Sequence, residues 1–208
     1  MLTLNKFLTI ALFLSINIPT YLSAHKFLLI MGPSGVGKST IINHLKKIDN
    51  RFEYIKPYTT RSLRVGETEK IHISLEEMEA LNKAGQLLTI NQFYGIYYAT
   101  PKNSIDELLE QGKFPILDWP IEKMDIMNEQ YENKLYKVYI EPDNIEELKN
   151  RLNNDDRDKN GNRYVAGIEE LNKLIAGHYD QNIDLKIVNK KNQAEEIALE
   201  IYNNFIAQ

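Results

Sequence analysis

The sequence predicts an α/β fold: a doubly wound, mostly parallel sheet with helices on both faces. Residues 25–31 form a continuous apolar run that ends at Gly32, a pattern typical of a strand buried on both faces. Helical periodicity begins directly after Lys38, with Ile41 and Leu45 on one side. Strand-like and helix-like segments then alternate along the chain, which predicts βαβ units and a parallel sheet.

Short apolar runs bounded by turn residues mark the other strands, and apolar residues three and four positions apart mark the helices. Strands are expected at residues 25–31, 52–55, 71–73, 87–93, 97–99, 114–118, 135–140 and 185–188. Helices are expected after Lys38 and at residues 75–84, 104–111, 121–132, 144–152, 163–179 and 193–205. The short strands on either side of Gly95 interrupt the alternation and predict a small antiparallel, acceptor-binding insert at about residues 57–100. Residues 153–163 are polar and rich in turn formers, which is typical of a mobile lid.

Composition limits the classes of function. A chain of 208 residues with 43% hydrophobic and 26% charged residues is ordinary for one globular domain. The net charge of -4 argues against a broad nucleic-acid surface, which needs a basic face. The sequence has no cysteine, so disulfides, thiolate metal ligands and cysteine nucleophiles are excluded, and the histidines lack metal-ligand spacing. A small phosphorylated partner remains compatible, because a few clustered cations can line one cleft. Composition does not define the oligomeric state.

The first 24 residues differ from the rest of the chain. Lys6 precedes an apolar run at residues 7–18, which is too short to span a bilayer but matches the apolar region of a signal peptide. Leu22 stands where a cleavage site prefers a small residue, so the alternative is a retained N-terminal helix. The protein is expected to be exported if the segment is cleaved and cytoplasmic if it is retained, with no stable membrane span. The globular domain is expected at residues 25–208.

A phosphate-binding loop follows the first predicted strand. Residues 32–39, Gly-Pro-Ser-Gly-Val-Gly-Lys-Ser, match G-x-x-x-x-G-K-[ST] at every fixed position. Glycines allow a tight turn that points backbone N–H groups at phosphate oxygens, and the following helix N-terminus favours an anion. Lys38 is expected to reach the β- and γ-phosphates of ATP. The expected ATP-binding residues of this loop are Gly32, Ser34, Gly35, Val36, Gly37, Lys38, Ser39 and Thr40.

A Mg²⁺ site is expected between the loop and a neighbouring strand. The Ser39 hydroxyl is the usual metal ligand of such a loop. Residues 114–118 form an apolar run that ends in Asp118, which supplies a carboxylate at the end of a strand. The alternative role for Asp118 is to cap the next helix. The metal would hold the β- and γ-phosphate oxygens and offset charge during transfer.

Two arginines define the expected acceptor side. Arg61 and Arg64 lie three residues apart, and Glu67 follows them. Paired arginine N–H donors can grip a phosphate, and the acid can hold one arginine in place.

Together, these segments resemble the guanylate kinase family over about residues 25–207 and in matching order. The resemblance rests on the phosphate loop, on Thr-Thr-Arg-x-x-Arg-x-Gly-Glu at residues 59–67, and on Tyr97-Tyr98, Ile116-Leu117-Asp118, Arg157 with Arg163, and Val188-Asn189. It implies that Arg61, Arg64 and Tyr98 hold the acceptor phosphate and that Glu67 orders their loop. It also implies that Arg157 and Arg163 close over ATP as lid residues. The catalytic residues that it implies are Lys38, Arg61, Arg157 and Arg163, and Asn189 is implied to belong to the ATP site.

The positions that recognise guanine in the family are changed. Pro57 stands at the usual hydroxyl position, Thr89 at the usual glutamate and Pro120 at the usual second acid. Lys123 stands where the family has a glycine, and Lys70 falls near the position where the family has an aromatic residue that assists the acceptor phosphate. Thr89 is therefore expected in the acceptor pocket with altered base recognition, because losing polar partners weakens selectivity.

The resemblance implies an ATP-dependent kinase of nucleoside monophosphates, with GMP as the family default. A sugar-phosphate kinase like ribose 1,5-bisphosphokinase is an alternative, because that branch also lacks the guanine-binding acids. A non-catalytic binding module is a second alternative, although Lys38, Ser39, Arg157 and Arg163 are all retained.

Overall fold

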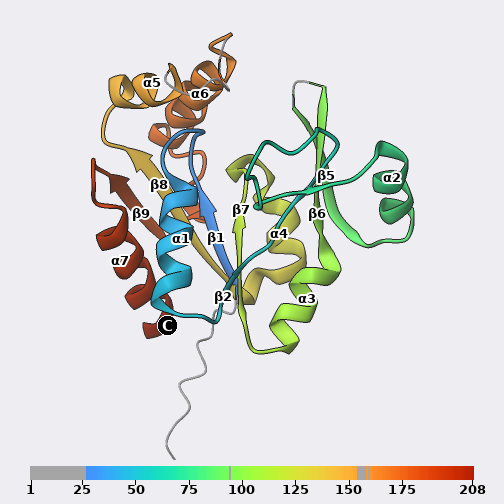
Figure 1. Ribbon diagram of the computed structural model, residues 1–208. Helices are drawn as coiled ribbons and strands as arrows, with labels where there is room; N and C mark the ends of the chain where they lie inside the picture. The colour runs from blue at the N-terminus through green and yellow to red at the C-terminus, as the bar shows by residue number, and fades with distance from the viewer. Residues whose placement is uncertain (1–26, 94, 154–157, 159) are drawn as a thin grey trace, which may run out of the picture.

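The computed structural model describes residues 27–93, 95–153, 158 and 160–208 (Figure 1). Within them, five parallel strands form one sheet in the order β2 (Phe52–Tyr54), β7 (Phe114–Asp118), β1 (Phe27–Met31), β8 (Leu135–Pro142) and β9 (Leu185–Asn189). The central strand β1 is buried along its whole length. The parallel sheet predicted from the alternation of strands and helices is thereby confirmed.

Helices cover both faces of this sheet. Side chains alternate between faces along β1, so Leu28 and Ile30 pack with one helix layer, and Phe27 and Leu29 with the other. The first layer contains α1 (Lys38–Ile48) and α7 (Ala194–Ala207). The second layer contains α3 (Lys102–Glu110), α4 (Met124–Tyr131), α5 (Ile145–Asn153) and α6 (Asn162–Ile175). The fold is therefore doubly wound, as expected.

A second sheet lies beside the first (Figure 1). Among the described residues it has four strands, in the order β4 (Ile71–His72), β3 (Tyr58–Thr59), β6 (Ile96–Pro101) and β5 (Leu87–Phe93). Strand β6 pairs antiparallel with β3 and β5, which confirms the antiparallel insert. Strand β4, however, pairs parallel with β3, and β3 was missed because it is only two residues long. Helix α2 (Leu75–Lys83) buries Met78 against Leu87 and Ala99.

Some boundaries differ from those predicted. The expected helix at 121–132 begins as a 3₁₀ turn, η1 (Ile121–Lys123), before α4, and ends in η2 (Glu132–Lys134). Helix α6 ends at Ile175, four residues early, and η4 (Asp180–Asn182) follows it. Helix α3 begins at Lys102, directly after β6. These differences are confined to element ends, where hydrogen bonding changes between helix types.

Two expectations fall outside the described residues: the N-terminal segment at residues 1–24, and Arg157 in the lid. Within the described part of the chain, none of the helices combines the length and apolar character needed to cross a bilayer.

Helix α7 provides a test of the core. Phe205 is 0% exposed, and its ring lies 5.3 Å from that of Phe52 and 5.1 Å from that of Phe114. Phe205→Ala is expected to lower the free energy of unfolding by about 3–5 kcal/mol, because it leaves a cavity. Urea unfolding measures this, with Leu199→Ala, 50% exposed on the same helix, as control. Equal losses in the two variants would contradict the predicted packing.

Candidate active site

A cavity of about 610 Å³ lies between the loop after β1 and the second sheet. Its walls come from the phosphate loop, the loop after β3, strands β5 and β6, the end of β7 and helix α6. Parallel strands bring their carboxyl ends to one edge of a sheet, where ligands bind in such folds. Most of the expected ATP residues of the loop, together with Arg61, Arg64, Glu67 and Tyr98 of the acceptor side, border this one space. Val36, Asn189 and Thr89 are not part of its lining.

The backbone of the phosphate loop has little space around it. Gly32 has φ 130°, and a Cβ there would collide with the carbonyl oxygen of Ile140 on β8. Gly37 has φ 106°, and a Cβ there would collide with Nδ2 of Asn189. Both φ values are disfavoured for residues with side chains. Helix α1 begins at Lys38, directly after Gly37, so its unpaired N–H groups border the cavity and favour an anion.

Lys38 folds back over its own loop. Its Nζ donates to the carbonyl oxygens of Gly32 (2.5 Å) and Pro33 (3.1 Å) and lies 3.6 Å from Oδ1 of Asp118. The side chain is only 10% exposed. The ammonium group is thus held beside the loop by oxygen atoms, and phosphate oxygens can take over these contacts when a nucleotide binds.

Two side chains brace the loop from behind. Asn189, buried at the end of β9, donates from Nδ2 to the carbonyl oxygen of Val36 at 2.7 Å. Arg151 on α5 donates to the same oxygen at 3.3 Å and to Glu147 at 3.1 Å. Asn189 therefore contacts the loop, and its contact with ATP stays a prediction. Arg151 could not be predicted from the sequence, because an arginine in a polar helix has no distinguishing pattern.

Asp118 lies where a metal ligand was expected. It pairs with Ile30 across β1 and β7, which places its carboxylate at the end of the sheet beside the loop. Asp118 and Ser39 both line the cavity, and the Asp118 side chain is 41% exposed. Among the described residues, no cluster of three or more His, Cys, Asp or Glu side chains could hold a metal. Mg²⁺ needs no such cluster, since it uses one or two protein oxygens with water and phosphates.

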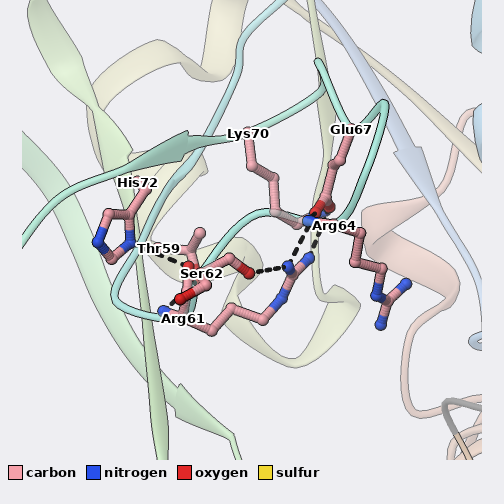
Figure 2. A network of polar contacts seen from close by, with 7 residues as sticks. All are labelled: Thr59, Arg61, Ser62, Arg64, Glu67, Lys70 and His72. Carbon is pink, nitrogen blue, oxygen red and sulfur yellow. Dashed lines mark hydrogen bonds and ion pairs between the residues drawn. The ribbon is translucent and has the colours of Figure 1, made fainter.

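The acceptor loop is organised by an ion pair (Figure 2). Arg61 donates from Nη1 and Nη2 to the two carboxylate oxygens of Glu67, at 2.8 and 2.6 Å. Glu67 also accepts from the backbone N–H of Arg64 at 3.1 Å, and Nζ of Lys70 lies 3.4 Å away. The hydrogen bonds from Arg61 hold the pKa of Glu67 at about 2, and Glu67 in turn raises the pKa of Arg61. Glu67 thus orders this loop, as expected.

The Arg64 side chain is directed away from this pair in Figure 2 and lines the cavity. It has no ion-pair partner among the described residues. The cationic groups that border this part of the cavity are Arg61, Arg64 and Lys70. Two of them share one carboxylate, which leaves net positive charge for an anionic acceptor.

Strands β5 and β6 form the far wall. Tyr98 and Thr100 line the cavity from β6, as does Asn91 from β5. The pairing shifts between Leu87 and Thr89, so Thr89 lies opposite Thr100, and Asn91 lies opposite Tyr98. Thr89 is not among the described lining residues. Thr89 and Asn91 are two positions apart, so their side chains share one face of β5, and Asn91 is the one that lines the cavity. A role for Thr89 in the acceptor pocket stays a prediction.

Helix α6 closes the cavity over the loop. Arg163 donates from Nη1 to Oγ of Ser34 at 3.2 Å, so it lies beside the phosphate loop, and its role as a lid residue stays a prediction. Asp158 accepts from the backbone N–H groups of Arg163 (2.8 Å) and Tyr164 (3.0 Å). A carboxylate at a helix N-terminus stabilises it. The Asp158 carboxylate thus fixes the first turn of α6.

The fold and site define a P-loop nucleotide-binding protein with a separate acceptor sheet. A model of the guanylate kinase family matches residues 24–204. The protein belongs to the guanylate kinase family.

The relatives support this assignment. The chain is 34% identical to a guanylate kinase of Oceanobacillus iheyensis over 127 residues, 60% of this chain and 61% of that protein. It is 30% identical to a guanylate kinase of Thermosynechococcus vestitus over 178 residues, 84% of this chain and 91% of the other. The crystal structure of the guanylate kinase from Anaplasma phagocytophilum has the same fold, with a TM-score of 0.68 and 23% identity over 89% of this chain and 86% of that chain. The first of these matches spans less than two thirds of the relative's length.

The ion pair at Glu67 predicts a pH-dependent contribution to stability. The pKa of Glu67 is about 2 in the folded protein, below its ordinary value of 4.5. This contribution is full above the ordinary pKa and is lost as the pH falls toward the folded value. The isosteric variant Glu67→Gln is therefore expected to be less stable near neutral pH, with a difference that narrows below about pH 4.5.

Urea unfolding across this pH range measures the difference. Glu79→Gln, on the exposed side of α2, is the matched control and is expected to show no such trend. A difference between wild type and Glu67→Gln that stays constant with pH would contradict the predicted ion pair.

Proposed function

We propose that this protein transfers the γ-phosphoryl group of ATP to a nucleoside monophosphate, with GMP as the preferred acceptor (GMP + ATP to GDP + ADP). The observation that carries the proposal is that one cavity contains both the phosphate loop and the arginine pair. Two phosphate-binding elements that border one space favour direct transfer between two bound phosphates.

The loop side holds the donor. N–H groups at the start of α1 and the Lys38 ammonium surround the β- and γ-phosphates, and Arg163 adds charge from α6. These groups offset the charge that spreads over the transferred group. Mg²⁺, held by Ser39 and Asp118, would neutralise phosphate charge when bound.

The acceptor side aligns the nucleophile. Arg61, Arg64 and Tyr98 hold the acceptor phosphate, one oxygen of which attacks the γ-phosphorus in line. The bond from that phosphorus to the β,γ-bridging oxygen breaks, and ADP leaves with its electron pair. Because the acceptor phosphate is itself the nucleophile, no protein side chain forms a covalent intermediate.

The cavity wall on the acceptor side, formed by β5, β6 and the residues beside them, favours a nucleotide over a sugar phosphate. Its apolar lining suits a flat base, which a ribose bisphosphate lacks. The apolar side chains that line this part of the cavity are Pro57, Phe93, Ile96, Trp119 and Pro120. A non-catalytic binding module has less support, because Lys38 is retained and its ammonium group is held beside the phosphate loop by the oxygen atoms of Gly32, Pro33 and Asp118.

The test is ADP production from MgATP by the full chain, with GMP, AMP, CMP, UMP and ribose 1,5-bisphosphate as acceptors. GMP is expected to give the highest kcat/KM. Lys38→Ala is expected to lower kcat by about 100- to 1,000-fold, the usual loss for one donor to transition-state charge.

Lys47→Ala, on the exposed side of the same helix, is the control and is expected to leave the rate unchanged. ATP binding without ADP production from any acceptor would contradict the proposal. Turnover of ribose 1,5-bisphosphate alone would also contradict it.

A further inference from the structure

A lysine from the main domain reaches the acceptor sheet. Lys123 in η1 donates from Nζ to Oδ1 of Asn91 on β5, 32 positions away in the chain. The backbone of Lys123 is fixed, because its carbonyl oxygen accepts from Nε1 of Trp119 at 3.1 Å and its N–H donates to Pro120 at 3.0 Å. The side chain therefore leaves from a rigid turn, and its contact with Asn91 is built into the fold.

This contact determines which end of the Asn91 amide faces the ligand. A lysine ammonium only donates, so the amide oxygen is the atom held by Lys123 and the NH₂ group lies on the other side. Asn91 is 9% exposed and lines the cavity, and its Nδ2 donates to no described residue. Among the described residues, Nδ2 of Asn91 is not one of the buried atoms that lack a partner, so the NH₂ group is accessible from the cavity that Asn91 lines. A ligand atom that accepts a hydrogen bond can therefore bind to it.

Asn91 lies on the part of the wall that suits a base. It is paired with Tyr98 across β5 and β6, and Phe93 and Trp119 border the same cavity. The aromatic rings of Phe93 and Tyr98 lie 6.1 Å apart. The amide thus projects from an apolar surface, where hydrogen bonds discriminate most strongly between ligands.

The carboxylates of the cavity are either engaged elsewhere or distant from Asn91. Glu67 is bound by Arg61, Asp118 lies beside Lys38, and Glu170 accepts from Tyr139 at 2.6 Å. Glu69 precedes β4, which is the edge of the sheet opposite to β5. Asn91 therefore presents its NH₂ donors at a place where none of the described carboxylates is available to bind the same part of a base.

We propose that Asn91, oriented by Lys123, donates to a carbonyl oxygen of the acceptor base and selects oxo bases over amino bases. This inference rests on the proposed nucleotide acceptor and names the residues that determine its class. Guanine and hypoxanthine present a 6-oxo group to Asn91, whereas adenine presents an amino group that also donates. Because no carboxylate accompanies Asn91, the 2-amino group of guanine makes no required contact, and IMP binds about as well as GMP.

Binding is measured directly through Trp119, the single tryptophan of the chain, which lines the cavity. Its fluorescence is titrated with GMP, IMP and AMP on the full protein. The wild type is expected to bind GMP and IMP within about tenfold of each other, and both at least about tenfold more tightly than AMP, the usual range for one buried hydrogen bond. IMP binding more than about tenfold weaker than GMP, or AMP binding as tight as GMP, would overturn the proposal.

Asn91→Asp keeps the shape of the side chain but replaces its two donors by an acceptor oxygen. One carboxylate oxygen stays on Lys123, and the other can accept from an amino base. The ratio of AMP to GMP affinity is expected to rise by about tenfold or more. Gln92→Glu makes the same amide-to-acid change at the next, exposed residue of β5 and is the control. An unchanged ratio in Asn91→Asp, or an equal shift in Gln92→Glu, would overturn the proposal.

Lys123→Met tests the positioning role. It keeps an apolar chain of similar length but frees the amide to rotate, so oxo-over-amino discrimination is expected to shrink while ATP affinity stays unchanged. Because this contact is remote from the transferred group, KM for GMP should rise with little change in kcat. A fall in kcat alone would overturn this role.

The two proposals fail separately. Base-selective binding without ADP production would remove the proposed transfer activity and leave the role of Asn91 intact. ADP production from GMP with an unchanged ratio of AMP to GMP affinity in Asn91→Asp would support the transfer activity and rule out the role of Asn91.

Discussion

The tight turn between β1 and α1 is the constraint on which the rest of the structure depends. Gly32 lies against the backbone of β8, and Gly37 lies against Asn189 at the end of β9. The turn therefore forms only when β1 occupies the centre of the sheet with β8 beside it and β9 beside β8. Packing on both faces of β1 fixes this position, and the buried core thereby determines the conformation of the phosphate loop.

The local parts of the site were predictable because short-range physics determines them. An apolar strand, a glycine turn and a helix N-terminus are consecutive in the sequence, so their chemistry can be recognised without the fold. The ion pair between Arg61 and Glu67 spans six residues in one loop, and its role was also anticipated. Asp118 required only that a neighbouring parallel strand end beside β1.

The remaining parts depend on long-range pairing. Strand β3 is two residues long, and its parallel pairing with β4 leaves no periodic pattern. Asn91 lines the cavity opposite Tyr98 of β6, and its partner Lys123 lies in η1, which packs against the five-stranded sheet. Arg151 meets the loop across 115 positions of chain. Contacts of this kind are set by tertiary packing, which a single sequence does not display.

The acceptor wall and the phosphate loop illustrate two ways of using positive charge. In the proposed transfer, backbone N–H groups around the loop and Lys38 would concentrate positive charge on the transferred group, where charge changes during the reaction. On the acceptor side, Glu67 neutralises part of the charge of Arg61 and Lys70 and holds Arg61 in place, whereas Arg64 forms no ion pair with any described residue and is proposed to bind the acceptor. Positioning and charge stabilisation are thereby assigned to different residues within one cavity.

In the proposed reaction, the two phosphate-binding elements face each other across one continuous site. A compound that joins adenosine and guanosine through five phosphates spans both elements at once, so its affinity reports whether they act together. Linking two ligands in the correct geometry makes the second binding event intramolecular. This compound is expected to bind at least about 100-fold more tightly than ATP or GMP alone. An affinity no higher than that of ATP would show that the two elements do not act on one pair of substrates.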